Sequence, residues 1–274
     1  MMKSNNLKIN NTNGVVYITF PLLSKCGVVN HAFSTRIGGV SNGQFSTMNL
    51  SFRNGDSFEN VMENYRRICK CANIDPDHLV LSRQTHTNNV VIVTKDDIGR
   101  GVTKESYCDV DGLITNEKGI ALVTQYADCT PLIFCDPIKK VIATSHAGWR
   151  GTVAEIGKVT VNRMAADFGC NKNDIIAAIG PCIGKCCYEV DMPVYNEFCK
   201  IPYINPMDIF TDKGGGKFML DLVAANKLIL LNSGIKEENI DLSDICTCCN
   251  SEELHSHRAT KGKRGNLAAI IELK

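Results

Sequence analysis

The sequence of 274 residues is long enough for one large domain or two small ones. Its composition, 44% hydrophobic and 22% charged, is ordinary for a soluble globular protein. The formal net charge of +1 argues against a broad nucleic-acid-binding surface, although one or two well-placed arginines could still bind a single phosphate.

The first residues differ in composition from the rest of the chain. Residues 1–14 are polar and rich in asparagine, and they lack the apolar core of a signal peptide. We expect a flexible tail there, followed by one catalytic domain over residues 15–274. No apolar run is long enough to span a membrane. We therefore expect a cytoplasmic protein with no membrane partner, as a monomer or small homo-oligomer.

Fourteen cysteines are many for this length. Without an export signal, they are expected to be reduced thiols and not disulfides. Several lie inside apolar runs, such as Cys135, and free cysteine packs well as a small hydrophobe. The cysteine count alone therefore identifies no functional thiol.

Short β-branched and apolar runs predict most of the strands. They lie at 15–20, 31–36, 79–82, 90–94, 111–115, 120–125, 131–136, 141–145, 175–179, 240–245 and 267–273. Helical spacing of apolar residues and capping signals predict helices at about 57–72, 152–168, 192–199 and 222–233. Because the strands come in clusters with few helices between them, we expect an α+β fold with mixed sheets.

The Gly214-Gly215-Gly216 run lies between two of the predicted helices. We expect a flexible connection there. It is not a phosphate-binding P-loop, because no Gly-Lys-Ser/Thr context follows it.

Three residues of metal-binding type lie at predicted strand ends. Cys129 is in the link between two strands, His146 just past the end of another, and His86 in the joint between two more. A thiolate and two imidazoles suit Zn²⁺, and three protein ligands leave the fourth position for water or substrate. The spacings match no short local signature, so they alone favour the competing interpretation of a buried thiol and two hydrogen-bonded histidines.

A second group of potential ligands lies near the C-terminus. Cys246 and Cys249 form a C-x-x-C pair, a familiar half of a structural zinc site, and His255 and His257 follow. Only five residues separate Cys249 from His255, which is short for a zinc knuckle. A structural zinc site and simple packing both stay open here, and packing is the simpler interpretation.

Several charged residues could bind an anion or transfer a proton. Arg150 is the strongest anion ligand, because it adjoins His146 and a predicted helix start, where free N–H groups favour negative charge. Arg36 ranks second, beside a Gly-Gly loop. Each is more often a surface or salt-bridge residue. The other candidates are Arg258 and Arg264 for anions, and Asp109, Asp111, Asp128 and Glu189 as acids or bases that could equally cap turns.

Eight motifs follow one another from about residue 31 to the C-terminus. They are residues 33–41, 84–86, 109–115, 127–131, 146–151, 180–184, 246–249 and 256–258. In type and order they resemble the laccase-domain family, the YfiH/YlmD-type proteins once called polyphenol oxidases and also described as peptidoglycan editing factors. Departures from the family pattern are modest: position 248 more often has a bulkier residue, and this chain is unusually rich in cysteine.

The resemblance implies a single-domain, four-layer αββα fold with mixed sheets. It implies a zinc site made by His86, Cys129 and His146, the three residues already singled out. It also implies purine nucleoside phosphorylase activity on adenosine, inosine and methylthioadenosine, with adenosine deamination as a second activity.

On this hypothesis, zinc-activated water can attack C6 of adenine, and Asp128 or Asp111 would donate a proton to the departing purine. Arg150 would hold the phosphate that attacks the ribose. The expected catalytic residues are Cys129, Asp128, Arg150 and Arg36, and the expected substrate- or phosphate-binding residues are Arg36, Arg150, Gln84 and Arg258.

Two alternatives stay open. One is a Cys–His hydrolase acting on peptidoglycan precursors, with Cys129 as nucleophile and His146 as base. The other is a non-enzymatic metal-binding accessory protein. True multicopper oxidase chemistry is discounted, because such clusters use many imidazoles in His-x-His pairs and this chain has six histidines with one such pair. Cu²⁺ could still occupy the His/Cys site adventitiously.

Overall fold

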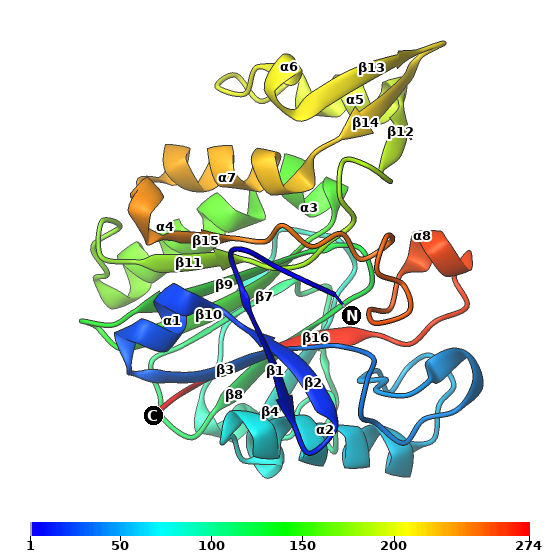
Figure 1. Ribbon diagram of the computed structural model, residues 1–274. Coiled ribbons are helices and arrows are strands. Elements are labelled where there is room, and N and C mark those ends of the chain that lie inside the picture. Colours follow the sequence, from blue (N-terminus) through cyan, green and yellow to red (C-terminus); the bar gives the residue numbers. More distant parts are fainter. Residues whose placement is uncertain (1) are drawn as a thin grey trace.

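Two stacked β-sheets form the centre of the protein, and helices cover both outer faces (Figure 1). The computed structural model describes residues 2–274. The seven-stranded sheet has the order β1 (Lys8–Thr12), β2 (Val15–Thr19), β3 (Val29–Ser34), β16 (Leu267–Leu273), β8 (Ala121–Tyr126), β4 (Leu79–Arg83) and β6 (Tyr107–Cys108). The six-stranded sheet has the order β15 (Ile240–Leu242), β11 (Ile176–Ile179), β9 (Thr130–Asp136), β10 (Val141–Ala147), β7 (Gly112–Thr115) and β5 (Val90–Ile92).

Both sheets are mixed. Strands β9 and β10 form an antiparallel hairpin, whereas β4 is parallel to β8 and β5 is parallel to β7. Apolar residues between the sheets form one core, and the two outer faces each carry another under their helices. The predicted α+β class with αββα layers is therefore confirmed.

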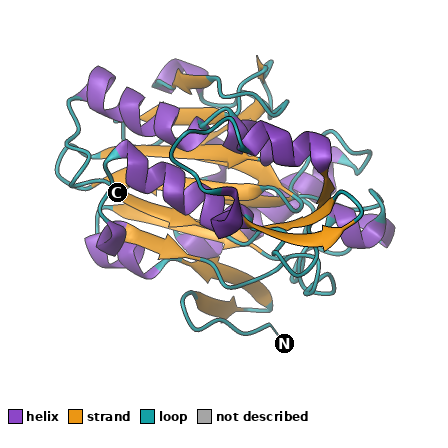
Figure 2. Cartoon of the chain, turned by 90° about the horizontal axis from the view of Figure 1, so that it is seen from above, coloured by secondary structure: helices purple, strands orange, loops and turns teal. Residues whose placement is uncertain are grey.

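Helix α2 (Phe58–Ala72) covers the seven-stranded sheet, and α4 (Ile156–Phe168) and α7 (Leu222–Ser233) lie together on the six-stranded sheet (Figures 1 and 2). The start of α2 is set by Ser57, whose hydroxyl accepts a hydrogen bond from the Asn60 N–H at 3.1 Å. Its buried face includes Val61, Tyr65 and Ile68, as the helical spacing predicts. The short helices are α1 (Pro21–Cys26), α3 (Trp149–Val153), α5 (Met192–Phe198), α6 (Pro206–Ile209) and α8 (His257–Thr260).

Part of the N-terminal segment differs from the expected flexible tail. Residues 8–12 form β1, which pairs with β2 along its whole length. Met2 and Leu7 are buried in the core between the sheets. These two apolar side chains and the backbone ladder hold a polar segment that composition alone assigns to a tail.

The predicted helix at 152–168 is in fact two helices. Helix α3 ends at Val153, and α4 begins at Ile156. Between them Glu155 adopts a left-handed conformation, with φ of 55°. Its carboxylate accepts hydrogen bonds from Lys158 and Tyr203, and these contacts stabilise the break between the two helices.

The glycine run at 214–216 closes a hairpin and is not an open connection. Strands β13 (Phe210–Gly214) and β14 (Lys217–Leu220) pair antiparallel, and β14 also pairs with β12 (Glu189–Asp191). All three glycines have positive φ, which a tight turn requires and glycine adopts without strain. This small sheet packs with α5 and α6 above α7 (Figure 1). No helix in the described part of the chain is long and apolar enough to cross a membrane.

Candidate metal centre and substrate pocket

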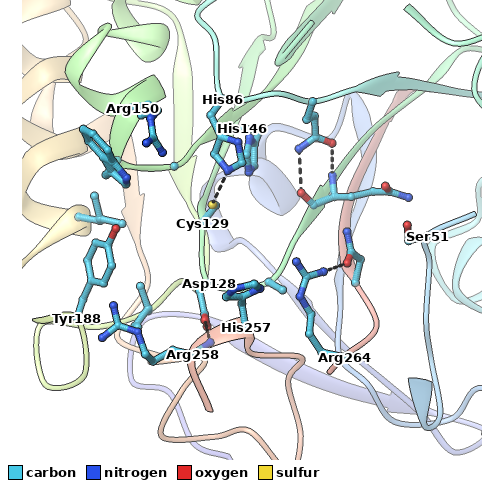
Figure 3. Close-up of a pocket in the computed structure, with 18 of the residues that line it drawn as sticks. Ser51, His86, Asp128, Cys129, His146, Arg150, Tyr188, His257, Arg258 and Arg264 are labelled. Atoms are coloured by element: carbon cyan, nitrogen blue, oxygen red, sulfur yellow. Dashed lines mark hydrogen bonds between the residues drawn. The ribbon is translucent and has the colours of Figure 1, made fainter. Parts of the chain in front are cut away.

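The three predicted metal ligands meet where the chain passes between the two central sheets. His86 lies on the connection from β4 in one sheet to β5 in the other, and Cys129 lies on the connection from β8 to β9. His146 is near the end of β10, paired with Pro131 of β9. Figure 3 shows these residues, far apart in sequence, side by side at the pocket.

Their ligand atoms are close enough to share one ion. His86 Nε2 lies 3.8 Å from Cys129 Sγ, and one nitrogen of each histidine and this sulfur all lie within 4.8 Å of one another. The two imidazole rings meet edge to face, with centroids 4.9 Å apart. Two imidazoles and a thiolate form a donor set that suits Zn²⁺ with an open fourth position.

Asp111 organises this centre without belonging to it. Its fully buried carboxylate lies 2.8 Å from His146 Nδ1 and accepts the backbone N–H groups of Thr85, His86 and Thr87 at 2.8–3.1 Å. The contact to Nδ1 leaves His146 Nε2 free for a ligand, and the three N–H contacts hold the loop that carries His86. His86 itself has a φ of 68°, a conformation that this loop enforces.

The protonation of the centre follows from these contacts. Burial raises the pKa of the Cys129 thiol, but His146 and His86 outweigh it and lower that pKa to about 6. Burial lowers the pKa of His146, but Cys129 and Asp111 outweigh it and raise that pKa to about 9. Burial opposes ionisation of Asp111, yet His146 and the loop N–H groups lower its pKa to about 2. At neutral pH these values make Cys129 a thiolate, the form that binds a metal, and His146 an imidazolium, which must release its proton before Nε2 can bind one.

Gly148 leaves the space that the centre needs. A Cβ atom at this position would lie 2.7 Å from His86 Cδ2 and 3.0 Å from Cys129 Sγ. The first contact is too close for a side chain and the second is tight, so the two neighbouring residues favour glycine here more than its own backbone angles do.

A pocket of about 520 Å³ opens beside the three ligands. Four arginines line it, and among residues 2–274 none of the four forms an ion pair with a carboxylate. Unpaired guanidinium groups around a cavity favour an anionic ligand. These arginines are Arg53, Arg150, Arg258 and Arg264.

Two aromatic rings also line the pocket, Trp149 and Tyr188. The Arg150 guanidinium lies 4.3 Å from the centroid of Trp149, and that of Arg258 lies 5.4 Å from the centroid of Tyr188. The pocket therefore combines cations with flat apolar surfaces, as recognition of a phosphate together with an aromatic base requires.

Most of the predicted substrate residues line this pocket, but they differ in how many of their side-chain groups are already hydrogen-bonded to the protein. Arg150 and Arg258 face it, and Arg258 is held by the carbonyls of Cys187 and Glu189 at 3.2 and 3.1 Å. The Gln84 amide is bonded to the backbone of Gln125 in both directions, at 2.8 and 2.9 Å. Gln84 therefore supports the pocket wall and has less capacity for a ligand.

Asp128 has both carboxylate oxygens engaged. They accept hydrogen bonds from the Thr247 hydroxyl and from the backbone N–H of Arg258, each at 2.6 Å. Its φ of 85° places it at a sharp turn directly before Cys129. These contacts join three separate segments of the pocket wall, so Asp128 holds the wall whatever else it does.

Arg36 does not line the pocket, and the phosphate-binding role predicted for it does not fit its position. Its Nε donates to the Ser46 carbonyl and its Nη1 to the Ser251 carbonyl, both at 2.7 Å. The guanidinium therefore ties two loops together. The Gly-Gly sequence beside it has a packing reason, since a Cβ at Gly39 would lie 2.1 Å from the Thr47 carbonyl oxygen.

The grouping of Cys246 and Cys249 with His255 and His257, which the sequence left open, does not form. His257 lines the main pocket, and His255 is buried against Gly265. The sulfurs near Cys246 and Cys249 belong instead to Cys186 and Cys187. Sequence reasoning also missed Arg53, Tyr188 and His257 as pocket residues; only the motif at 256–258 pointed toward one of them.

Comparisons with known proteins agree with this architecture. The family model described as multi-copper polyphenol oxidoreductase laccase matches residues 30–274. The chain is 36% identical over 245 residues to purine nucleoside phosphorylase YlmD of Bacillus subtilis (strain 168), covering 88% of this chain and 87% of that protein. It is 34% identical over 231 residues to adenosine deaminase RL5 from an unknown prokaryotic organism, covering 83% and 87%.

The crystal structure of hypothetical protein YfiH from Bacillus licheniformis superimposes with a TM-score of 0.92 at 29% identity, covering 98% of this chain and 100% of that one. The match therefore extends over both central sheets and the connections that carry the three ligands. The chain belongs to the laccase-like family of the YlmD and YfiH proteins.

Proposed function

We propose that this protein is a zinc-dependent purine nucleoside phosphorylase with adenosine deaminase activity. The observation that carries the proposal is a His₂Cys donor set beside a pocket lined by unpaired arginines and two aromatic rings. The names of its relatives support it, because they include both a purine nucleoside phosphorylase and an adenosine deaminase.

His86, Cys129 and His146 would hold the metal. Their chemistry favours Zn²⁺, although Cu²⁺ also accepts imidazole and thiolate ligands. A bound Zn²⁺ would supply Lewis acidity and lower the pKa of water in the open position. The family's copper-oxidase description does not change this assignment, because the described donor set provides only two imidazoles.

In phosphorolysis, a phosphate oxygen forms a bond to C1′ of the ribose while the bond from C1′ to the purine breaks. The bonding electrons leave with the purine, which takes up a proton, and the products are the free base and ribose 1-phosphate. Arg150 and Arg258 would bind and orient the phosphate by charge-assisted hydrogen bonds. The adjoining guanidinium groups of Arg53 and Arg264 would raise the local concentration of the anion.

The purine would lie against Trp149 and Tyr188, whose rings provide flat apolar surfaces. Proton donation to the departing base by Asp128 stays a prediction. Asp111 does not suit that task, because it is fully buried and its low pKa keeps it a carboxylate. Its role is to position His86 and His146. In deamination, water adds at C6 of adenine and ammonia leaves.

The decisive assay follows adenosine with and without phosphate. We expect adenine and ribose 1-phosphate to form only when phosphate is present, and inosine to form without it. Release of adenine and free ribose, independent of phosphate, would contradict a phosphorylase. Inosine and methylthioadenosine in the same assay rank the substrates.

One observation favours a second candidate, a Cys–His hydrolase acting on peptidoglycan precursors. Asp111 orients His146 as a base would be oriented, and His146 lies beside Cys129, the candidate nucleophile. His146 also lowers the pKa of the Cys129 thiol. Such an enzyme would keep its activity after complete removal of metal and lose it on alkylation of Cys129. The phosphorylase would lose its activity with the metal.

A further inference from the structure

A second cluster of potential metal ligands lies away from the His₂Cys centre. The sulfurs of Cys186, Cys187, Cys246 and Cys249, the tetracysteine cluster, all lie within 4.8 Å of one another. Cys249 Sγ is 3.4 Å from the sulfurs of both Cys186 and Cys187. A disulfide needs about 2.05 Å between sulfurs, so these are four free thiols.

The spacing of the sulfurs matches a tetrahedral thiolate site. Two thiolates that each lie 2.3 Å from one Zn²⁺ are about 3.8 Å apart when the angle at the metal is tetrahedral. The observed separations, from 3.4 Å to at most 4.8 Å, bracket this value. A set of four sulfur donors selects zinc or iron and is one of the usual forms of structural zinc site.

The fold brings the two cysteine pairs together for a topological reason. Strands β11 and β15 are parallel neighbours, so the segments that follow them leave the sheet at the same end. Beyond the strands, the backbones of Cys182 and Cys246 still pair as an isolated parallel β-bridge. The Thr247 N–H donates to the Cys182 carbonyl at 2.9 Å. The turn at 184–188 therefore faces the turn at 246–250.

Backbone donors point at one of the sulfurs. The Gly184 N–H donates to Cys246 Sγ at 3.1 Å, and the Cys249 N–H lies 3.5 Å from the same sulfur. A Cβ at Gly184 would lie 3.0 Å from Cys246 Cβ and 3.3 Å from Cys186 Sγ. Glycine thus permits the approach, and N–H donors to sulfur stabilise thiolate ligands.

Simple hydrophobic packing explains this cluster poorly. Cys186 and Cys249 are exposed, whereas the packing thiols of this chain, such as Cys69 and Cys135, are fully buried. Cys187 packs partly against the core beneath the small sheet, but the two exposed thiols fill no apolar core. A bound metal ion explains the proximity of the four sulfurs better than packing does.

We propose that the tetracysteine cluster binds a structural Zn²⁺ ion, separate from the His₂Cys centre. Binding replaces four S–H bonds by four Zn–S bonds and releases four protons, with no change of oxidation state. The ion would join the turn at 184–188 to the turn at 246–250, two segments more than 55 residues apart in sequence.

These two turns support the main pocket. The Cys187 carbonyl accepts a hydrogen bond from Arg258, and Tyr188 follows directly and lines the pocket. On the other turn, Thr247 donates to Asp128, the neighbour of Cys129. The structural ion would therefore hold the pocket wall without contacting a substrate.

Metal counting on the full-length protein tests this proposal. Purified from zinc-supplemented medium, the wild type should hold two zinc ions per chain. Cys186→Ser/Cys249→Ser should hold one, and His86→Ala/His146→Ala should also hold one. The matched control Cys108→Ser/Cys199→Ser removes two exposed thiols outside both clusters and should hold two. Cys248→Ser, in the same turn as the cluster, should also hold two.

A second measurement covers failure of the serine variant to fold. Native wild-type protein loaded with zinc is alkylated and mapped by mass spectrometry, with metal-free protein as reference. Cys186, Cys187, Cys246 and Cys249 should be protected only when zinc is present, whereas Cys199 should react in both.

The proposal is overturned if Cys186→Ser/Cys249→Ser keeps as much zinc as the wild type, if the four sulfurs are recovered as disulfides, or if they hold iron. Failure of the proposed function gives a different result. A wild type with one zinc that is lost in Cys186→Ser/Cys249→Ser, and kept in His86→Ala/His146→Ala, supports this site while removing the metal from the catalytic proposal.

Discussion

At the scale of single residues, the candidate site depends as much on Asp111 as on the three ligands. One buried carboxylate fixes the ring of His146 and the loop that carries His86. The sequence marked Asp111 only as one of several acids, because its role arises from contacts with residues more than twenty positions away. His86, Cys129 and His146 lie together as expected. Their role as metal ligands stays a prediction, and only the family resemblance raised it above the packing interpretation.

Replacing Asp111 tests this positioning role. Asp111→Asn keeps the shape but removes the negative charge and can present an N–H to His146 Nδ1, which favours the wrong imidazole tautomer. We expect zinc affinity at the His₂Cys centre to fall by about 10–100-fold. Competition with a chromophoric chelator measures it. Asp109→Asn, an exposed neighbour bonded to Thr85, is the control and should leave the affinity unchanged.

Arg150 carries the prediction for phosphate. Arg150→Ala should raise the KM for phosphate roughly 10–100-fold, since a charge-assisted hydrogen bond contributes about 1.5–3 kcal/mol. Steady-state kinetics at fixed adenosine and varied phosphate measure it. Arg66→Ala, on an exposed face of α2, should leave the KM unchanged. An unaltered phosphate KM in Arg150→Ala would assign the anion to the other arginines of the pocket.

At the scale of elements, local patterns predicted strands and long helices well and connections poorly. Strands β9 and β10 are buried along their whole length, and their apolar runs at 131–135 and 141–143 signal this without tertiary information. By contrast, the break at Glu155 and the ordering of β1 depend on distant partners. The pairing of β11 with β15, which unites the tetracysteine cluster, likewise has no local signature.

The N-terminal cap of α2 offers a prediction at this scale. Ser57→Ala removes the acceptor for the Asn60 N–H from an exposed position, so no cavity forms. The free energy of unfolding should fall by about 1 kcal/mol. Ser57→Asp restores a capping oxygen and should recover most of this loss in the same urea titration. Equal stability of all three proteins would show that the cap contributes nothing.

At the scale of the whole molecule, buried neutral histidines link stability to pH. His31 is buried, and its Nε2 accepts the Phe20 N–H at 2.9 Å. Burial, followed by the charge of Lys274, lowers its pKa to about 4, against about 6.5 in the unfolded chain. The folded protein therefore binds fewer protons than the unfolded chain in this window. Neutral His31 contributes fully to the free energy of unfolding above pH 6.5, and this contribution is lost as the pH falls toward 4.

His31→Gln tests this linkage, because an amide oxygen can accept the same N–H and does not titrate. Between pH 7 and pH 5 the wild type should lose about 2 kcal/mol more unfolding free energy than the variant. Urea unfolding at several pH values measures both. Because the other titrating groups are common to both proteins, parallel pH profiles would refute the role of His31.

The central claim is that the His₂Cys centre provides a metal for phosphorolysis. The most direct measurement titrates Zn²⁺ into chelated, metal-free protein while following phosphate-dependent release of adenine from adenosine. Using Cys186→Ser/Cys249→Ser confines zinc to one centre. Activity should be absent at the start and rise to its maximum at one zinc per chain. Full phosphate-dependent release of adenine by the metal-free protein would contradict the account, because phosphorolysis would then need no metal at the His₂Cys centre.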